Sequence, residues 1–194
     1  MINNEQAQKL SDEEIARLSL ENRDYFLLII NRYKEKLLRY VRRLSNISSE
    51  DADDLLQEIF LKVYLNLNDF DEDLKFSSWI YAIARNQTIS HYRKLKVRAE
   101  GHAVAIDDKN FKEIMSDFDI KKDMDTGYLR ENILKILDKL DGKYREILIL
   151  KFFEEKDYRE ISDIIKRPVG TVGSLMNRAK AEFRKKLIGQ NIKL

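Results

Sequence analysis

The chain has 194 residues, 43% of them hydrophobic and 36% charged, which is enough for one or two globular domains. No apolar run approaches the roughly 20 residues that span a bilayer, and the polar, acidic N-terminus is unlike a secretory signal, so we expect no membrane insertion. Without cysteine the chain has neither a disulfide framework nor a thiolate zinc site, which favours a cytoplasmic protein.

The net charge is only +2, but the charges are unevenly distributed, with two basic regions separated by an acidic one. Residues 85–98 hold five Lys plus Arg and no acid, and residues 140–194 hold thirteen Lys plus Arg against eight Asp plus Glu. Between them, residues 107–125 hold seven Asp plus Glu against four Lys. This distribution allows a nearly neutral chain to contact nucleic acid at two separate places.

Helical spacing of apolar residues dominates the whole sequence. One proline and six glycines leave few helix breaks, and strand-like alternation is absent, so we predict an all-α fold. The first predicted N-terminal element is a long amphipathic helix, or a broken pair of helices, over 22–44. It is followed by a helix within 47–67 with Ser48 or Ser49 as N-cap, a polar loop over 68–76 containing two phenylalanines, and a third helix over 77–98.

A second helical region follows a segment of weak periodicity. The apolar stripe resumes at Tyr128, and further helices are predicted within 143–153, 157–166 and 167–186. We therefore predict two small helical domains joined by a linker, the C-terminal one a helix-turn-helix. The predicted boundaries are an N-terminal tail over 1–21, a first helical domain over 22–98, an acidic linker over 99–127 and a second domain over 128–194.

The stretch DADDLLQEIFLKVYLNL, residues 51–67, places leucines on both sides of a helix. At about 100° per residue, one side collects Ala52, Leu55, Leu56, Ile59, Phe60, Val63 and Leu67. The opposite side collects Asp54, Gln57, Glu58, Leu61, Leu65 and Asn68. An apolar centre with a polar rim indicates a docking surface, although a solvated face with single leucines is the plain alternative. The acids diverge in direction and no histidine complements them, so we predict no metal site and no cofactor.

The helix predicted over 77–98 is aromatic and basic. Tyr81, Arg85, Thr88 and Tyr92 share one face at helical spacing. Aromatic planes beside a guanidinium suit stacking on an unpaired nucleic-acid strand. Asn86 either reads a base or caps a backbone group, and Trp79 is also consistent with a place in the core.

A short helix, a tight turn and a second basic helix end the chain, which is the plan of a DNA-binding helix-turn-helix. In the second helix the core side is predicted to hold Val172, Leu175 or Met176, Ala179, Phe183 and Leu187. The outer side holds Thr171, Ser174, Asn177, Arg178, Ala181, Arg184 and Lys185. Short polar side chains near the helix start can reach base edges, and later cations can reach phosphates. A small core with a merely solvated basic face is the alternative.

Taken in order, these segments resemble a bacterial RNA polymerase sigma factor of the extracytoplasmic-function (ECF) type, group four of the sigma-70 family. DADDLLQEIFLKVY resembles the family segment that binds the clamp helices of core RNA polymerase. FSSWIYAIARNQTISHYRK resembles its strand-opening and minus-ten segment. The run from Leu140 to Lys185, with Y-R-E, Y-x-E-I and P-x-G-T-V, resembles its minus-thirty-five-binding domain.

The resemblance implies a non-enzymatic protein that binds core polymerase, recognises the minus-ten and minus-thirty-five promoter elements and promotes strand opening for transcription initiation. Its implied partners are core polymerase, promoter DNA and an anti-sigma factor. The implied polymerase-binding residues are Asp53, Asp54, Gln57, Glu58 and Leu61. The implied minus-ten residues are Phe76, Trp79, Tyr81, Arg85, Asn86, Thr88, Tyr92 and Arg93. The implied minus-thirty-five residues are Thr171, Ser174, Asn177, Arg178, Lys180 and Arg184.

The sequence departs from the family pattern in its C-terminal domain. Gly173 stands where members usually have lysine, Leu175 where they have arginine, and Lys166 at a frequent turn glycine. A proline usual near Asp141 is also missing. We therefore expect weak or altered minus-thirty-five binding, with the remaining cations of the last helix compensating.

Two other functions remain open from sequence. One is a DNA-binding regulator that uses only the C-terminal helix-turn-helix, and the other is a helical adaptor that binds no DNA. A DNA-binding regulator would not explain the outward side of the 51–67 helix that carries Leu61. An adaptor would give the basic faces no function. An enzyme is not expected, because no nucleophile–base pair or ligand constellation is present.

Overall fold

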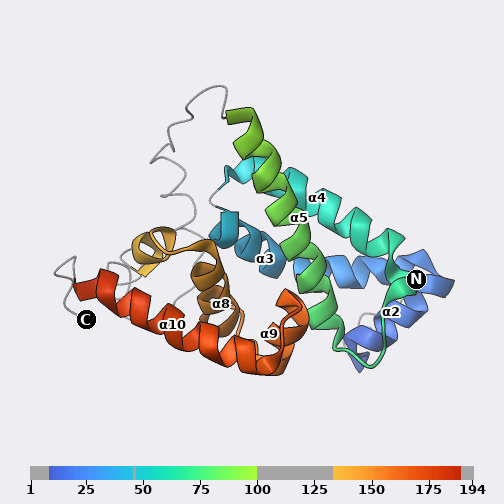
Figure 1. The fold of residues 1–194 in the computed structure, drawn as a ribbon. Helices are drawn as coiled ribbons and strands as arrows, with labels where there is room; N and C mark the ends of the chain where they lie inside the picture. The colour runs from blue at the N-terminus through green and yellow to red at the C-terminus, as the bar shows by residue number, and fades with distance from the viewer. Residues whose placement is uncertain (1–8, 46, 100–132, 189–194) are drawn as a thin grey trace, which may run out of the picture. The chain divides into compact units, whose positions relative to one another are not determined.

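A computed structural model describes residues 9–45, 47–99 and 133–188 (Figure 1). Within these ranges the chain forms α-helices and short 3₁₀ helices joined by turns, with no strand, so the all-α prediction is confirmed. The chain divides into two compact units, the first holding α2 to α5 and the second holding α8, most of α9 and α10. The predicted acidic linker, from residue 100 onward, lies outside the described residues.

Over residues 9–99, the described part of the first unit contains four α-helices. In chain order its elements are α2 (Asp12–Glu21), η1 (Arg23–Tyr25), α3 (Phe26–Ser45), α4 (Ser49–Leu65), η2 (Leu67–Asp69) and α5 (Phe76–Ala99). Ser48 is the N-cap of α4, and its Oγ accepts a hydrogen bond from the Asp51 backbone N–H at 3.0 Å. The residues between η2 and α5 are turns, as predicted for the polar loop.

The core of the first unit lies where α3, α4 and α5 pack on one another. Each helix contributes apolar side chains three or four residues apart, which places them on one side of the helix. Fully buried examples are Ile29, Leu37 and Tyr40 of α3, Leu55, Ile59 and Val63 of α4, and Ile80 and Ala84 of α5. Burying each large aliphatic side chain contributes about 1.5–3 kcal/mol.

Helix α2 is the main difference from the sequence prediction, which assigned residues 1–21 to an N-terminal tail. Ser11 and Glu14 form a capping box: the Glu14 N–H donates to Ser11 Oγ at 3.1 Å, and the Ser11 N–H donates to Glu14 Oε2 at 2.7 Å. Ile15 is fully buried, and α2 contacts both α3 and α5. The many acids of this segment therefore start a helix whose other side is apolar.

In the described residues, the second unit contains a helical segment over 133–138, followed by α8 (Gly142–Phe152), α9 (Tyr158–Ile165) and α10 (Val169–Ile188). Asp141 caps α8 and Asp157 caps α9 through their side chains. Helix α10 packs against α8. The capped ends and short turns match the helix-turn-helix arrangement that the sequence predicted for α9 and α10.

Candidate functional site

Helix α4 has one buried side and one exposed side, as its sequence predicts. Every residue predicted on the inner side is buried, and every residue predicted on the outer side is exposed. The two outward leucines are largely uncovered, Leu61 by 59% and Leu65 by 66%. Asp54, Gln57 and Glu58 are exposed beside them. The outward surface therefore has an apolar centre with an acidic and amide rim, which we call the α4 face.

Two further side chains belong to the α4 face. Asp53 is exposed, and Tyr64 is 42% exposed while its ring packs edge-to-face on Phe26, with centroids 5.1 Å apart. Tyr64 was not among the residues predicted for this surface, although its place three residues after Leu61 puts it on the same side of a helix. Across the described ranges, no group of three or more acidic or histidine side chains is placed to hold a metal ion.

An aromatic cluster surrounds the start of α5. The Phe76 ring lies 5.2 Å from Phe70 and 5.5 Å from Trp79, and Phe70 and Trp79 are 5.4 Å apart. Phe76 is fully buried, whereas Phe70 and Trp79 are partly exposed. Phe76 was expected to bind minus-ten DNA; its ring is buried against Phe70 and Trp79, so these two rings provide the solvent-exposed aromatic surface.

Two residues of the predicted minus-ten face of α5 are buried as well. Tyr81 is 2% exposed and its ring lies 5.1 Å from that of Tyr40, and Thr88 is 1% exposed and donates its hydroxyl to the Ala84 carbonyl at 2.8 Å. Thr88 follows Ile80 and Ala84 at four-residue steps, and this stripe faces the core. Tyr81 and Thr88, both expected to bind minus-ten DNA, thus have buried side chains in this structure.

The exposed side of α5 retains the other predicted residues. Asn86, Tyr92 and Arg93 are exposed, with Tyr92 uncovered by 53%, and Arg85 is partly exposed. Asn86 Oδ1 accepts a long hydrogen bond of 3.4 Å from Arg85 Nη1. An amide, a guanidinium and a phenol thus share a surface that solvent reaches.

Helix α10 also has the predicted two sides. Val172, Met176 and Ala179 are buried, so Met176 rather than Leu175 takes the core position. All seven residues predicted on the outer side are exposed. Lys180 lies on the flank instead, where its Nζ is 5.7 Å from the Phe152 ring centre, and with Arg184 it lines an apolar pocket between α8 and α10.

Two sigma-factor family models match the chain. One describes sigma-70 region 2 and matches residues 29–98, and the other describes sigma-70 region 4 and matches residues 130–183. The ECF RNA polymerase sigma factor SigW of Bacillus subtilis (strain 168) is 33% identical over 181 residues, which cover 90% of this chain and 95% of SigW. The chain belongs to the ECF sigma factors of the sigma-70 family.

Other relatives and solved structures agree with this assignment. The sigma factor is 30% identical to the RNA polymerase sigma-H factor of Pseudomonas aeruginosa, with 96% of each chain covered. It is also 30% identical to the ECF sigma-E factor of Escherichia coli (strain K12), covering 93% of this chain and 96% of that protein. The fold resembles CnrH bound to the cytosolic domain of CnrY (TM-score 0.67, 21% identity, 93% and 99% covered). It equally resembles RpoE bound to the anti-sigma factor NepR from Bartonella quintana (TM-score 0.66, 21% identity, 84% and 96% covered).

The region 2 match covers α4 and α5 up to residue 98, and the region 4 match covers α8, α9 and α10 up to residue 183; α2 lies outside both. In the described part of the sigma factor no helix is long and apolar enough to cross a bilayer. Lys166, at the position where members often have glycine, adopts the left-handed conformation with φ 53° and ψ 52°. That conformation costs a non-glycine residue about 1–2 kcal/mol, which explains why glycine is common there.

Gly173 lies on the partly exposed side of α10. A Cβ atom added there would meet nothing closer than the Tyr158 ring, at 4.0 Å, which is ordinary van der Waals contact. The fold of this sigma factor therefore has room for a Cβ atom at this position, so the first atom of a side chain causes no clash with the described neighbours.

Proposed function

We propose that this sigma factor docks on core RNA polymerase through the α4 face, binds the minus-ten element with the start and outer side of α5, and binds the minus-thirty-five element with the outer side of α10. The observation that carries the proposal is the α4 face. A helix that already fills the core with one side presents two exposed leucines and a polar rim on the other. Such a surface is typical of a protein interface.

Docking through the α4 face would use both parts of the surface. Leu61, Leu65 and Tyr64 offer apolar area whose burial contributes about 25 cal/mol per Å². The rim residues Asp54 and Glu58 would orient the partner through charge and favour a basic surface on the polymerase. The apolar centre of the α4 face would supply affinity, and its acidic rim would orient the partner.

Promoter opening would use the partly exposed rings and polar groups of α5. Phe70 and Trp79 stand at the start of the helix, and Tyr92 stands two turns beyond the Arg85–Asn86 pair. Stacking of an unpaired base on an aromatic ring is worth about 1–3 kcal/mol, and Arg93 can neutralise a phosphate. An opened strand would therefore gain contacts that duplex DNA does not.

Recognition of the minus-thirty-five element would use α10 in the major groove. Thr171, Ser174 and Asn177 lie on its exposed N-terminal half, and Arg178 and Arg184 follow. Hydroxyl and amide groups can read base edges, and the guanidinium groups can contact phosphates or guanine. Lys180 would contribute from the flank of the helix.

The sigma factor would perform no bond chemistry itself, since polymerisation belongs to the core enzyme. Its partners would be core polymerase, at the clamp helices, and promoter DNA. CnrH and RpoE are each seen bound to a protein partner, the cytosolic domain of CnrY and the anti-sigma factor NepR. By analogy we propose an anti-sigma factor in the cytoplasm that covers the α4 face and so prevents docking.

Transcription with purified components tests the proposal. Core polymerase, genomic template and the sigma factor are expected to give transcripts whose start sites share two upstream elements. A DNA-binding regulator would bind DNA without binding core polymerase, and an adaptor would give no promoter-dependent transcript. Binding of core polymerase without any promoter-dependent initiation would contradict the proposed function.

Replacing Gly173 with lysine is expected to strengthen minus-thirty-five binding. One added phosphate contact raises affinity about fivefold at 0.15 M salt and steepens the dependence of log K on log salt by about one. Gly173→Ala is the matched control, because it gains the same helix propensity, about 1 kcal/mol, without the charge. Fluorescence anisotropy on duplex promoter DNA over a salt series measures both. Equal affinities for the two variants would show that the missing lysine has no role in binding.

A further inference from the structure

We propose that Glu13 of α2 is a positioning residue for promoter opening, because its carboxylate fixes the start of α5 and thereby the aromatic cluster of Phe70, Phe76 and Trp79. This inference rests on the proposed function of α5. Helix α2 lies outside both matched family regions, so nothing in those matches assigns it a role. The contact joins residues 63 positions apart in the sequence.

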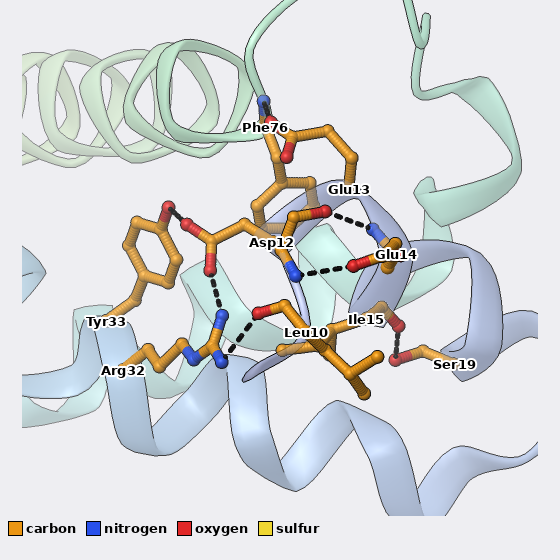
Figure 2. A network of polar contacts seen from close by, with 10 residues as sticks. Leu10, Asp12, Glu13, Glu14, Ile15, Ser19, Arg32, Tyr33 and Phe76 are labelled. Atoms are coloured by element: carbon orange, nitrogen blue, oxygen red, sulfur yellow. Dashed lines mark hydrogen bonds and ion pairs between the residues drawn. The ribbon is translucent and has the colours of Figure 1, made fainter. Parts of the chain in front are cut away.

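Glu13 reaches from α2 to the first residue of α5 (Figure 2). Its Oε1 accepts a hydrogen bond from the Phe76 backbone N–H at 2.9 Å. The first turn of α5 contains no acidic residue of its own. The free N–H groups of a helix start carry a partial positive charge, so a carboxylate there makes a charge-assisted hydrogen bond. Helix α2 thus supplies a carboxylate to the start of α5, whose own first turn has none.

The neighbouring residue, Asp12, binds Tyr33 of α3, whose ring packs against the Phe76 ring. Tyr33 donates its hydroxyl to Asp12 Oδ2 at 2.5 Å, and the Tyr33 ring lies 5.9 Å from the Phe76 ring at 71°. Burial raises the pKa of the Tyr33 hydroxyl, and the hydrogen bond to Asp12 raises it further, so the donor proton is retained at neutral pH. Adjacent carboxylates of α2 therefore accept hydrogen bonds from the Tyr33 hydroxyl and from the Phe76 backbone N–H, as Figure 2 shows.

Helix α2 is itself held in place against α3. Arg32 donates to Asp12 Oδ1 at 2.7 Å and to the Leu10 carbonyl at 2.9 Å. Ile15 and Ala16 are buried at 0% and 2% exposure. The positions of Asp12 and Glu13 relative to α3 are consequently set by packing, hydrogen bonds and an ion pair together.

The contact between Glu13 and Phe76 affects the aromatic surface on which unpaired bases are proposed to stack. Phe76 lies under both Phe70 and Trp79, with ring centres 5.2 and 5.5 Å away. Residues 71–75 between them are turns with no regular helix. Fixing the Phe76 backbone therefore limits the freedom of the two partly exposed rings. Preorganised rings lose less conformational freedom when a base stacks on them.

The test compares acid substitutions on adjacent residues of α2. Glu13→Ala removes the contact to α5, whereas Glu14→Ala removes the carboxylate half of the α2 capping box and leaves α5 untouched. Holoenzyme with Glu13→Ala is expected to form about tenfold less open complex, which corresponds to about 1.4 kcal/mol. Glu13→Gln keeps an acceptor oxygen and is expected to recover most of the opening. Permanganate reactivity of unpaired thymines on a duplex promoter measures the open complex.

Two further measurements separate positioning from folding. Affinity for core polymerase is expected to stay within about twofold for every variant, because the α4 face is unchanged. A template already unpaired over the minus-ten element is expected to reduce the Glu13→Ala defect, since melting is no longer required. Glu13→Asp keeps the charge but withdraws the oxygen from Phe76, and it is expected to lose opening as well, which keeps the test valid if Glu13→Ala does not fold.

The outcomes are distinct. Equal losses for Glu13→Ala and Glu14→Ala would assign the effect to α2 stability and overturn the proposal, as would unchanged opening with Glu13→Ala and Glu13→Asp. Loss of core-polymerase binding in the Glu13 variants would assign their loss of promoter opening to misfolding of the first unit. If the unmodified sigma factor opens no promoter with core polymerase, the proposed function itself fails, whatever Glu13 does.

Discussion

Reversing the charges at Asp54 and Glu58 to arginine and replacing Leu61 with serine is expected to weaken binding to core polymerase by at least about 100-fold. Central interface residues each contribute about 2 kcal/mol or more when they are removed, and 2.7 kcal/mol corresponds to about 100-fold. Leu61 lies at the centre of the α4 face, and the two acids lie on its rim. The substitution thus removes the apolar centre and opposes the charge of the partner at once.

The same variant is expected to remain folded. All three side chains are exposed, Leu61 by 59%, and none fills the core of the first unit. Surface substitutions of this kind change the free energy of unfolding by about 0.5 kcal/mol or less. Helix α4 keeps its N-cap at Ser48 and its buried side. A loss of binding would therefore report the surface and not the fold.

The measurement is a titration of labelled core polymerase with each variant, alongside thermal unfolding. The matched control is Leu20→Ser with Glu21→Arg and Glu35→Arg, which places the same three kinds of change on α2 and α3, where Leu20 is 50% exposed. The control is expected to bind within about twofold of the unmodified protein. Comparable affinity for the control and the α4 variant would remove the basis for docking through this helix.

Replacing Arg178 and Arg184 with alanine is expected to lower affinity for minus-thirty-five duplex DNA by about 50-fold at 0.1 M salt. Each lost phosphate contact reduces the slope of log K against log salt by about 0.9, so the slope is expected to fall by about 1.8. Both arginines are exposed on α10. Arg178 stands near the centre of the outer side, whereas Arg184 borders the apolar pocket. The two single variants will show which position carries more of the effect.

Anisotropy on minus-thirty-five DNA across a salt series provides the measurement. Lys139→Ala with Lys143→Ala removes the same charge from exposed positions before and at the start of α8, and it serves as the control. The control is expected to keep the slope, because long-range charge is screened beyond about 10 Å at 0.1 M salt. If both double variants lose the same slope, the effect is one of net charge, and α10 has no special place in DNA binding.

The sequence predicted both sides of α4 and the exposed side of α10, because the period of 3.6 residues is a local property of the chain. In α10, Val172, Met176 and Ala179 are buried as expected, whereas Phe183 and Leu187 are only partly buried. Lys180 lies on the flank of α10 beside Phe152. Where the larger apolar stripe of a helix is distinct, the side that faces the core follows from the sequence alone.

The buried side of α5 could not be predicted from the periodicity of its sequence. Its apolar and polar residues are distributed around the whole helix, so several faces were equally suited to the core. Packing against α3 and α4 selected the stripe of Ile80, Ala84 and Thr88, and it brought Tyr81 onto Tyr40. Two expected DNA contacts became core residues by this choice.

The amino-acid sequence by itself determined the all-α class, the family and the surfaces of α4 and α10, because these depend on residue order over short distances. The Ser11–Glu14 capping box that starts α2 was also present in the sequence and was passed over. Only the tertiary structure decided that Glu13 meets the Phe76 backbone and that Asp12 meets Tyr33. Such contacts join distant segments, and their partners are fixed by the packing of helices, which no local pattern encodes.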